Sequence, residues 1–135
     1  MDKIINDLAG EACKRSICPA ASALDILGDK WTLLVVRDLL LGKKTYGELQ
    51  DSPEKVPTNI LADRLKRLER AGLLVKNPYQ QRPVRYSYQL TEKGTDLEEV
   101  LQSLMVWADK HIPGTLPLAE VEKRMAEAQK SKNES

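Results

Sequence analysis

The stretch from Pro57 to Thr91 constrains the fold more than any other part of the chain. In its first half, Leu61, Leu65 and Leu68 recur at the spacing of a buried helical stripe, and Gly72 follows as a helix-ending residue. Its second half has a short apolar run, a turn-rich tip containing Pro78 and Pro83, and an alternating segment through Tyr86, Tyr88 and Leu90. The stretch therefore predicts one helix followed directly by a β-hairpin.

Cations are concentrated in this stretch, although the formal net charge of the 135-residue chain is only +1. Between Thr58 and Tyr88 there are seven cations against two acids, whereas five acids face one lysine between Glu92 and Asp109. One interpretation of such a charged segment is an ordinary solvent-exposed face with no binding role. Its overlap with a helix and hairpin favours a winged helix, in which one helix reads the DNA major groove.

Local signals divide the first half of the chain into short helices. Asp29 is expected to cap a central core helix, and Thr45 with Glu48 forms the pattern of a capping box, with Leu49 pointing inward. Pro19 suits the first turn of the helix at 19–28, because an N–H in the first turn has no hydrogen-bond acceptor within the helix and its loss costs nothing. The expected helices cover residues 4–15, 19–28, 30–42 and 45–50.

A last long helix is predicted from Thr91 to His111. Its apolar stripe repeats at helical spacing and consists of Leu97, Val100, Leu101, Leu104, Met105 and Ala108. A small winged helix has nothing left to cover this stripe, so a partner subunit is expected to do so. Beyond Pro113 and Gly114 the sequence predicts one short helix and a polar frayed tail.

The chain is expected to fold as one mainly α domain with a small β-hairpin wing (α+β). Its predicted parts are an N-terminal dimerisation helix (1–17), a winged helix-turn-helix (18–91), a C-terminal dimerisation helix (92–112) and a short helix with a flexible tail (113–135). The N-terminus has no apolar run of signal-peptide length, and no run is long enough to span a membrane. A cytoplasmic protein with Cys13 and Cys18 as thiols is expected.

Five blocks of the chain match, in order and spacing, the pattern of one family. They are CPAASALDILGDKWTLLVVRDLLLG, TYGEL, NILADRLKRLERAGL, RPVRYSYQLTEKG and the helix ending WADKH. The chain resembles the HxlR-type family of bacterial winged helix-turn-helix transcription regulators. The resemblance implies a homodimer on a palindromic operator and no cofactor, and it marks Cys18 as a redox- or electrophile-sensitive position. Cys13 is an additional thiol, and the tail after Gly114 lies outside the shared pattern.

The outward arc of the 58–70 helix is expected to read DNA. Asn59 can pair bidentately with adenine, and Arg82 at the wing tip can enter a minor groove or clamp the backbone. The alternatives are a helix-start role for Asn59, an ordinary loop cation at Arg82, and either phosphate contact or hairpin support at Arg64. The candidate DNA-binding residues are Thr45, Thr58, Asn59, Asp63, Arg64, Lys66, Arg67, Gln81, Arg82 and Arg85, with Lys43 and Lys44 as weaker phosphate contacts.

Cys18 precedes a proline at a helix start, where the helix dipole and nearby Lys14 and Arg15 favour a thiolate. Oxidation or alkylation that releases DNA is one hypothesis for this thiol, and simple packing at a subunit boundary is the other. The predicted dimer interface comprises Ile4, Leu8, Leu97, Leu101, Leu104, Met105 and Trp107.

An enzyme is not expected. The chain has one histidine, His111, and no metal-ligand spacing, phosphate-binding glycine loop or nucleophile–base pair is recognisable. No cofactor, obligatory small-molecule ligand or membrane partner is predicted. Repression is expected over activation because occluding a promoter needs no further partner. A winged helix used for protein binding, or for non-specific DNA binding, is the alternative function.

Overall fold

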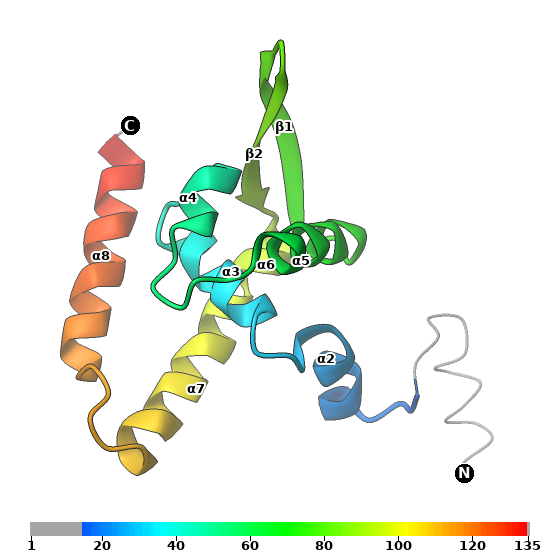
Figure 1. Ribbon diagram of the computed structural model, residues 1–135. Coiled ribbons are helices and arrows are strands. Elements are labelled where there is room, and N and C mark those ends of the chain that lie inside the picture. Colours follow the sequence, from blue (N-terminus) through cyan, green and yellow to red (C-terminus); the bar gives the residue numbers. More distant parts are fainter. Residues whose placement is uncertain (1–14, 135) are drawn as a thin grey trace.

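The computed structural model describes residues 15–134, with side chains described up to residue 130. A two-stranded antiparallel hairpin rises from a body of helices, as the sequence predicts (Figure 1). The expected helix at 4–15, with Ile4 and Leu8, lies almost wholly outside the described residues. In chain order the elements are α2 (Pro19–Leu27), α3 (Thr32–Leu40), α4 (Tyr46–Gln50), α5 (Thr58–Arg70), β1 (Leu74–Gln81), β2 (Val84–Leu90), α6 (Glu92–Thr95), α7 (Leu97–His111) and α8 (Leu118–Glu134).

Helix α3 is the centre of the core, as its apolar circumference predicts. It touches α2, α4, α5, α7 and β2, and it buries residues all along its length. The helix is shorter than predicted at both ends. At its start the Asp29 carboxylate accepts the N–H groups of Trp31 and Thr32 at 2.8 and 3.0 Å, and at its end Gly42 turns the chain with φ +103°. The core around it comprises Val35, Val36, Leu39, Leu40, Leu49, Val56, Leu61, Leu65, Leu68, Leu73, Leu74 and Leu101.

Helix α5 follows the predicted leucine stripe and ends as predicted at Gly72. Gly72 has φ +77°, and the N–H groups of Gly72 and Leu73 donate to Glu69 O (3.0 Å) and Leu68 O (2.9 Å). This is a Schellman motif, which favours glycine because its positive φ strains residues with a Cβ. The motif ends α5 and turns the chain sharply, so that β1 of the hairpin begins two residues after Gly72.

The hairpin is longer, and its tip tighter, than predicted. Pro78 lies within β1 opposite Tyr86, where an irregularity in register follows it, and only Arg82 and Pro83 form the turn. Proline is tolerated there because β1 has an open outer edge, where a missing N–H breaks no ladder bond. At the root of the hairpin, Thr91 donates its hydroxyl to Gly72 O at 2.6 Å, which ties the end of β2 to the end of α5.

The predicted helix from Thr91 to His111 is broken into α6 and α7 at Asp96. Thr91 caps α6 by accepting the Gly94 N–H at 3.2 Å. Gly94 is packed so closely that a Cβ there would lie 2.1 Å from Leu73 O. The short α6 therefore fits tightly under the hairpin root, and α7 leaves it as a separate helix.

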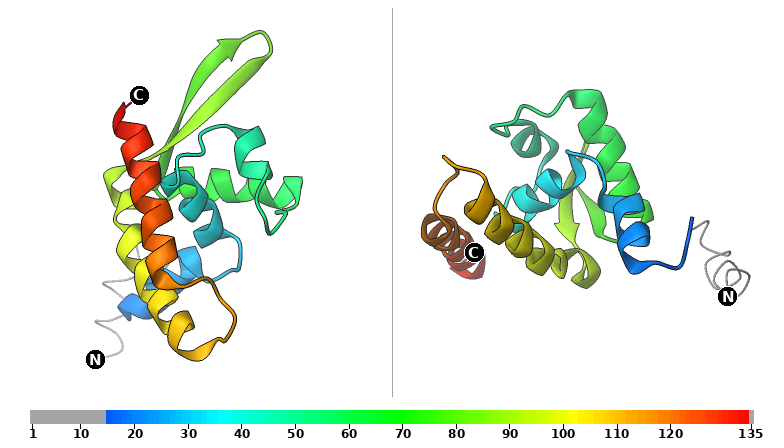
Figure 2. Two further views of the ribbon diagram at one scale, coloured as in Figure 1. Left: turned by 90° about the vertical axis from the view of Figure 1, so that its left-hand side faces the viewer. Right: turned by 90° about the horizontal axis from the view of Figure 1, so that it is seen from below.

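Helices α7 and α8 lie side by side and antiparallel (Figures 1 and 2). Helix α8 extends to Glu134, so the expected short helix and frayed tail are a single long helix in the described residues. Leu97, Leu101 and Met105 of α7 pack in the chain's own core, together with Met125 of α8. Leu101 is thereby buried within the chain, Leu97 and Met105 are half-buried, and the prediction that these three residues lie at a dimer interface stays a prediction.

Two apolar surfaces remain exposed in the described part of the chain. Val100, Leu104 and Trp107 form a stripe on α7, where the side chains of Leu104 and Trp107 are 50% and 59% exposed. Helix α2 buries none of its residues, and its Leu24 is exposed. None of the described helices is both long and apolar enough to cross a membrane.

Candidate nucleic-acid interface

The outer face of α5 is polar and exposed along its length. Asn59, Asp63, Lys66 and Arg70 are exposed opposite the buried leucines, as the helical spacing predicts, while Arg67 on the same arc is half-buried and Thr58 is exposed at the start of the helix. Pro57 occupies the N-cap position, and no described side chain caps this end of the helix. Asn59 therefore lies inside the first turn without a capping role, and its amide makes no hydrogen bond within residues 15–130.

Arg64 lies differently from the other cations of α5. Its Nε donates to Asp29 Oδ1 at 3.1 Å, and its Nη1 bonds Asp63, while only 15% of the side chain is exposed. Burial alone would lower the pKa of Arg64, but its hydrogen bonds to Asp29 and Asp63 raise it. The Arg64 guanidinium therefore joins α5 to the turn before α3, a contact that the sequence did not predict, and DNA contact by Arg64 stays a prediction.

Asp29 accepts hydrogen bonds from several directions. Burial alone would raise the pKa of its carboxyl, but bonds from Thr32, Trp31 and Arg64 hold it well below its usual range. Arg67 Nη1 lies 3.9 Å from Asp29 Oδ2, a longer ion pair that leaves the guanidinium half-exposed. The prediction that Asp29 is the N-cap of α3 is corrected, because Trp31 occupies that position, and Asp29 accepts its hydrogen bonds from the preceding turn. The contact of Asp29 with α5 is one that the sequence did not predict.

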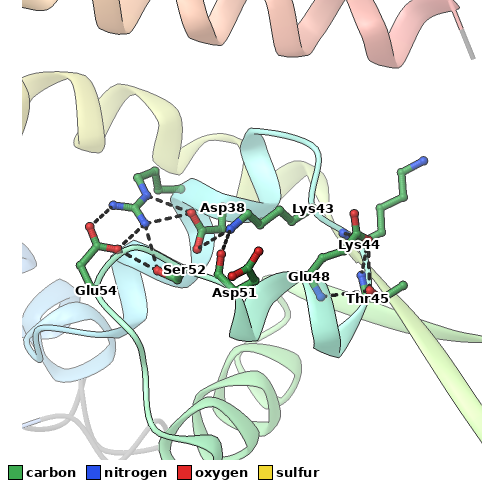
Figure 3. Close-up of polar contacts among 9 residues, drawn as sticks. Asp38, Lys43, Lys44, Thr45, Glu48, Asp51, Ser52 and Glu54 are labelled. Carbon is green, nitrogen blue, oxygen red and sulfur yellow. Dashed lines mark hydrogen bonds and ion pairs between the residues drawn. The ribbon is translucent and has the colours of Figure 1, made fainter.

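Helix α4 begins with the predicted capping box. The Glu48 N–H donates to Thr45 Oγ1 at 3.2 Å, and the Thr45 N–H donates to Glu48 Oε1 at 3.1 Å. The hydrogen bonds that the N–H groups of Thr45 and Lys44 donate to the Glu48 carboxylate lower its pKa. Figure 3 shows Thr45 and Glu48 directed toward each other. The Thr45 hydroxyl is therefore engaged within the helix start, which weakens its case as a DNA contact.

Tyr46, which sequence reasoning missed, donates its hydroxyl to Thr58 O at 2.7 Å and joins α4 to the start of α5.

A polar cluster holds the connection between α4 and α5. Arg37 of α3 bonds Glu54 at 2.7 Å and Asp38 at 2.9 Å, and Ser52 donates to Glu54 at 2.8 Å. Lys43 reaches the Asp51 carbonyl at 2.9 Å in the same cluster (Figure 3). The hydrogen bond from Arg37 lowers the pKa of Glu54 to about 2. The sequence indicated only a loop here, since no local pattern predicts which cation a loop carboxylate meets.

The wing carries exposed cations far from the body of the molecule. Arg82 is at the two-residue tip, Arg85 follows on β2, and Gln81 ends β1. Gln80 donates its side-chain amide to the Pro83 carbonyl at 3.2 Å, which closes the tip. Lys76 lies over the Tyr86 ring with Nζ 4.6 Å from its centroid, a contact that sequence reasoning missed.

Cys18 is a free, exposed thiol at the N-cap of α2. Its own N–H donates to Ser16 Oγ at 3.1 Å. Arg15, expected to favour the thiolate, instead directs its guanidinium to Asp25 at 2.7 Å. Lys14 and Cys13 lie outside the described residues. The exposure of Cys18 leaves it accessible within a single chain.

A helix pair α4–α5 resting on α3, followed at once by a hairpin tied to the end of α5, defines a winged helix-turn-helix protein. The model of the HxlR-like helix-turn-helix family matches residues 26–115. The chain belongs to this family. Helix α8 lies beyond the matched residues.

Known proteins similar to this chain include regulators of transcription. An uncharacterised HTH-type transcriptional regulator of Mycobacterium tuberculosis, Rv3095, is 37% identical over 91 residues, or 67% of this chain and 57% of that protein. The regulator YodB of Bacillus subtilis is 35% identical over 96 residues, covering 70% of this chain and 86% of YodB. The chain thus spans under two thirds of the length of the mycobacterial relative.

Solved structures show the same fold. Reduced YodB superposes with a TM-score of 0.61 and 34% identity over 73% of this chain and 98% of YodB. The redox regulator HypR in its reduced form gives a TM-score of 0.65 and 27% identity over 71% of this chain and 95% of HypR.

Proposed function

We propose that this protein is a sequence-specific double-stranded DNA-binding transcription regulator. The observation that carries the proposal is the outer face of α5, where exposed Asn59, Asp63 and Lys66 follow an uncapped helix start. A major groove about 12 Å wide accepts one such helix, and side chains near its N-terminus reach the base edges. Arg82 and Arg85 on the wing then contact the backbone or a minor groove.

The regulator acts as a homodimer on a palindromic operator. The exposed stripe of Val100, Leu104 and Trp107 supports this proposal, because exposed apolar surface of this kind marks protein contacts. A two-fold pair of winged helices places its half-sites about 34 to 36 Å apart, in successive major grooves. Repression by promoter occlusion is the simplest outcome, since it requires no further partner.

Cys18 makes the regulator responsive to oxidants or electrophiles. Similar proteins support this part of the proposal: HypR is described as a redox regulator, and YodB has been solved reduced, diamide-treated and quinone-bound. In this chain the exposed thiol at the start of α2 is accessible to such reagents. A Cys18→Ser variant should bind DNA but lose oxidant-induced release, with Cys13→Ser as the matched control. Full release by the Cys18→Ser variant would contradict the proposal.

The deciding experiment is an affinity selection of genomic fragments on the purified, reduced protein, with a parallel sample treated with a thiol oxidant. Enrichment of one short inverted repeat is expected, with loss of that enrichment after oxidation. Binding to the repeat should also weaken steeply with salt, because phosphate contacts release counterions. No enrichment in either sample would favour the alternative, a winged helix used for protein binding or for non-specific DNA binding.

A further inference from the structure

We propose that Asp29 is a positioning residue for DNA reading, because its carboxylate fixes the rotation of α5 against the body of the protein through Arg64. The inference rests on the proposed DNA-binding function. It concerns a contact between the turn before α3 and the flank of α5, away from the exposed face that meets the bases.

The Asp29 carboxylate is itself held firmly. Its Oδ1 accepts the N–H groups of Trp31 and Thr32 at 2.8 and 3.0 Å, and its Oδ2 accepts the Thr32 hydroxyl. These donors belong to the start of α3, the central helix of the core, and Thr32 is buried. The Asp29 carboxylate is therefore held in place relative to α3, and a side chain that binds this carboxylate is held in place relative to α3 as well.

Arg64 reaches this carboxylate from α5. Its Nε lies 3.1 Å from Asp29 Oδ1, and Arg67, one turn later on the same flank, lies 3.9 Å from Oδ2. The side chains of Arg64 and Asp29 are 15% and 24% exposed. A charge-assisted hydrogen bond with this much shielding is stronger and more directional than an ordinary surface ion pair.

Helix α5 is held by core packing and by a few directional contacts. Leu61, Leu65 and Leu68 are buried in the close-packed core. The Tyr46 hydroxyl bonds the Thr58 carbonyl at 2.7 Å at the start of the helix, and Lys93 Nζ bonds the Ala71 carbonyl at 2.7 Å just past its end. Both of these contacts are made to the backbone at the helix ends, whereas the pair of Asp29 and Arg64 holds a side chain on the flank of the helix, where it resists a roll directly.

The roll of α5 decides which side chains meet the base edges. Asn59, Asp63 and Lys66 share the outward arc, and Arg64 lies on its flank, next in sequence to Asp63. A hydrogen-bonding constellation must be held within about 0.5 Å of its productive geometry. Loss of the bond between Asp29 and Arg64 should therefore reduce discrimination between DNA sequences more than it reduces the sequence-independent affinity for the phosphate backbone.

The test compares Asp29→Asn, Arg64→Gln and the double variant with the wild type, and uses Glu120→Gln and Arg124→Gln on α8 as charge-matched controls for the first and second variant. Asparagine keeps an Oδ1 that accepts the N–H groups of the α3 start, so the fold is retained, but it has no charge and so removes the charge assistance of the bond from Arg64 Nε. The measured quantity is the ratio of affinities for the selected operator and for a random duplex. Each single variant should lower this ratio about tenfold, and the double variant no further, since contacting residues couple.

Direct phosphate contact by Arg64 makes a different prediction. Arg64→Gln would then weaken both duplexes equally and reduce the salt slope by about 1, while Asp29→Asn would not. That pattern, or fully additive losses in the double variant, would overturn the proposal.

A DNA-free measurement separates this inference from the proposed function. Residual dipolar couplings of the α5 amides, relative to those of α3, should change in Asp29→Asn and stay unchanged in Glu120→Gln. Unchanged α5 couplings in Asp29→Asn would overturn the positioning role. If the wild type preferred no sequence, the proposed function would fail, and the couplings would still decide whether Asp29 orients α5.

Discussion

Helices α5 and α7 are similar in construction and opposite in the surface they present. They have 13 and 15 residues, and each buries leucines in the same core. The outer face of α5 is polar and cationic, whereas that of α7 is an apolar stripe in an acidic segment. The cationic face of α5 suits a polyanion, and the apolar stripe of α7 suits the surface of another protein. One core thus orients two exposed surfaces of different chemistry.

The shared core should dominate stability. Leu61 is fully buried, so Leu61→Ala should lower the free energy of unfolding by about 2–5 kcal/mol, through lost burial and the cavity left behind. Urea denaturation at a fixed protein concentration measures this change. Leu116→Ala, at an exposed leucine after α7, should change it by less than about 0.5 kcal/mol. Equal effects of the two substitutions would show that α5 does not depend on its leucine stripe.

A charge placed on the apolar stripe should break the dimer without unfolding the chain. Leu104→Arg should cost about 2 kcal/mol or more of dimerisation free energy, because it puts an unpaired cation in the contact. Sedimentation over a range of concentrations measures the dimer. Val106→Arg is the matched control, since Val106 is similarly exposed on the opposite side of α7. If both variants dimerise as the wild type does, the stripe is not the subunit contact.

Within the DNA face, helix and wing should contribute differently. Asn59→Ala should cost about 1–3 kcal/mol at the preferred operator and relax discrimination at one base pair. Arg82→Ala should weaken all sequences more evenly and reduce the salt slope by about 1. Titrations of specific and random duplexes at several salt concentrations measure both effects. Identical losses on both duplexes for both variants would contradict the proposal that Asn59 contacts bases and Arg82 contacts the DNA backbone.

Much of α5 and its surroundings could be predicted because the signals are local. The leucine spacing, the glycine at the helix end and the capping box at Thr45 each depend on residues within one or two turns. The same periodicity revealed the apolar side of α7 but not what covers it. Leu101 and Met105 pack in the chain's own core together with Met125 of α8, a contact that periodicity does not reveal.

The polar contacts of the site could not be predicted because they join distant segments. Arg64 meets Asp29 across 35 positions, and Arg37 meets Glu54 across 17. In the sequence each of these residues is one charge among many, and only the packing of α5 on α3 decides the pairs. The prediction that Pro78 lies in the turn is wrong for a related reason, since a register irregularity within β1 has no clear sequence signal.

The smallest expected effect tests whether polar contacts at the start of α5 add to the stability that its leucines provide. The bond from Arg37 lowers the Glu54 pKa from 4.5 to about 2, so this carboxylate stabilises the folded state above pH 4.5. The contribution should fade as the pH drops from 4.5 towards 2, because the unfolded chain then binds the proton more readily. The Glu54 side chain is 38% exposed, so solvent screening keeps the contribution below about 1 kcal/mol.

Urea denaturation of Glu54→Gln and wild type at several pH values measures this term. The difference between the two proteins should be largest near neutral pH and shrink towards pH 2. Glu120→Gln, which removes an exposed pair with Arg124 on α8, should cost less than about 0.5 kcal/mol. A Glu54→Gln difference that did not depend on pH would mean that the ionised carboxylate contributes nothing. The connection between α4 and α5 would then be held by packing and by its other hydrogen bonds, such as those from Lys43 to the Asp51 carbonyl and from Tyr46 to the Thr58 carbonyl.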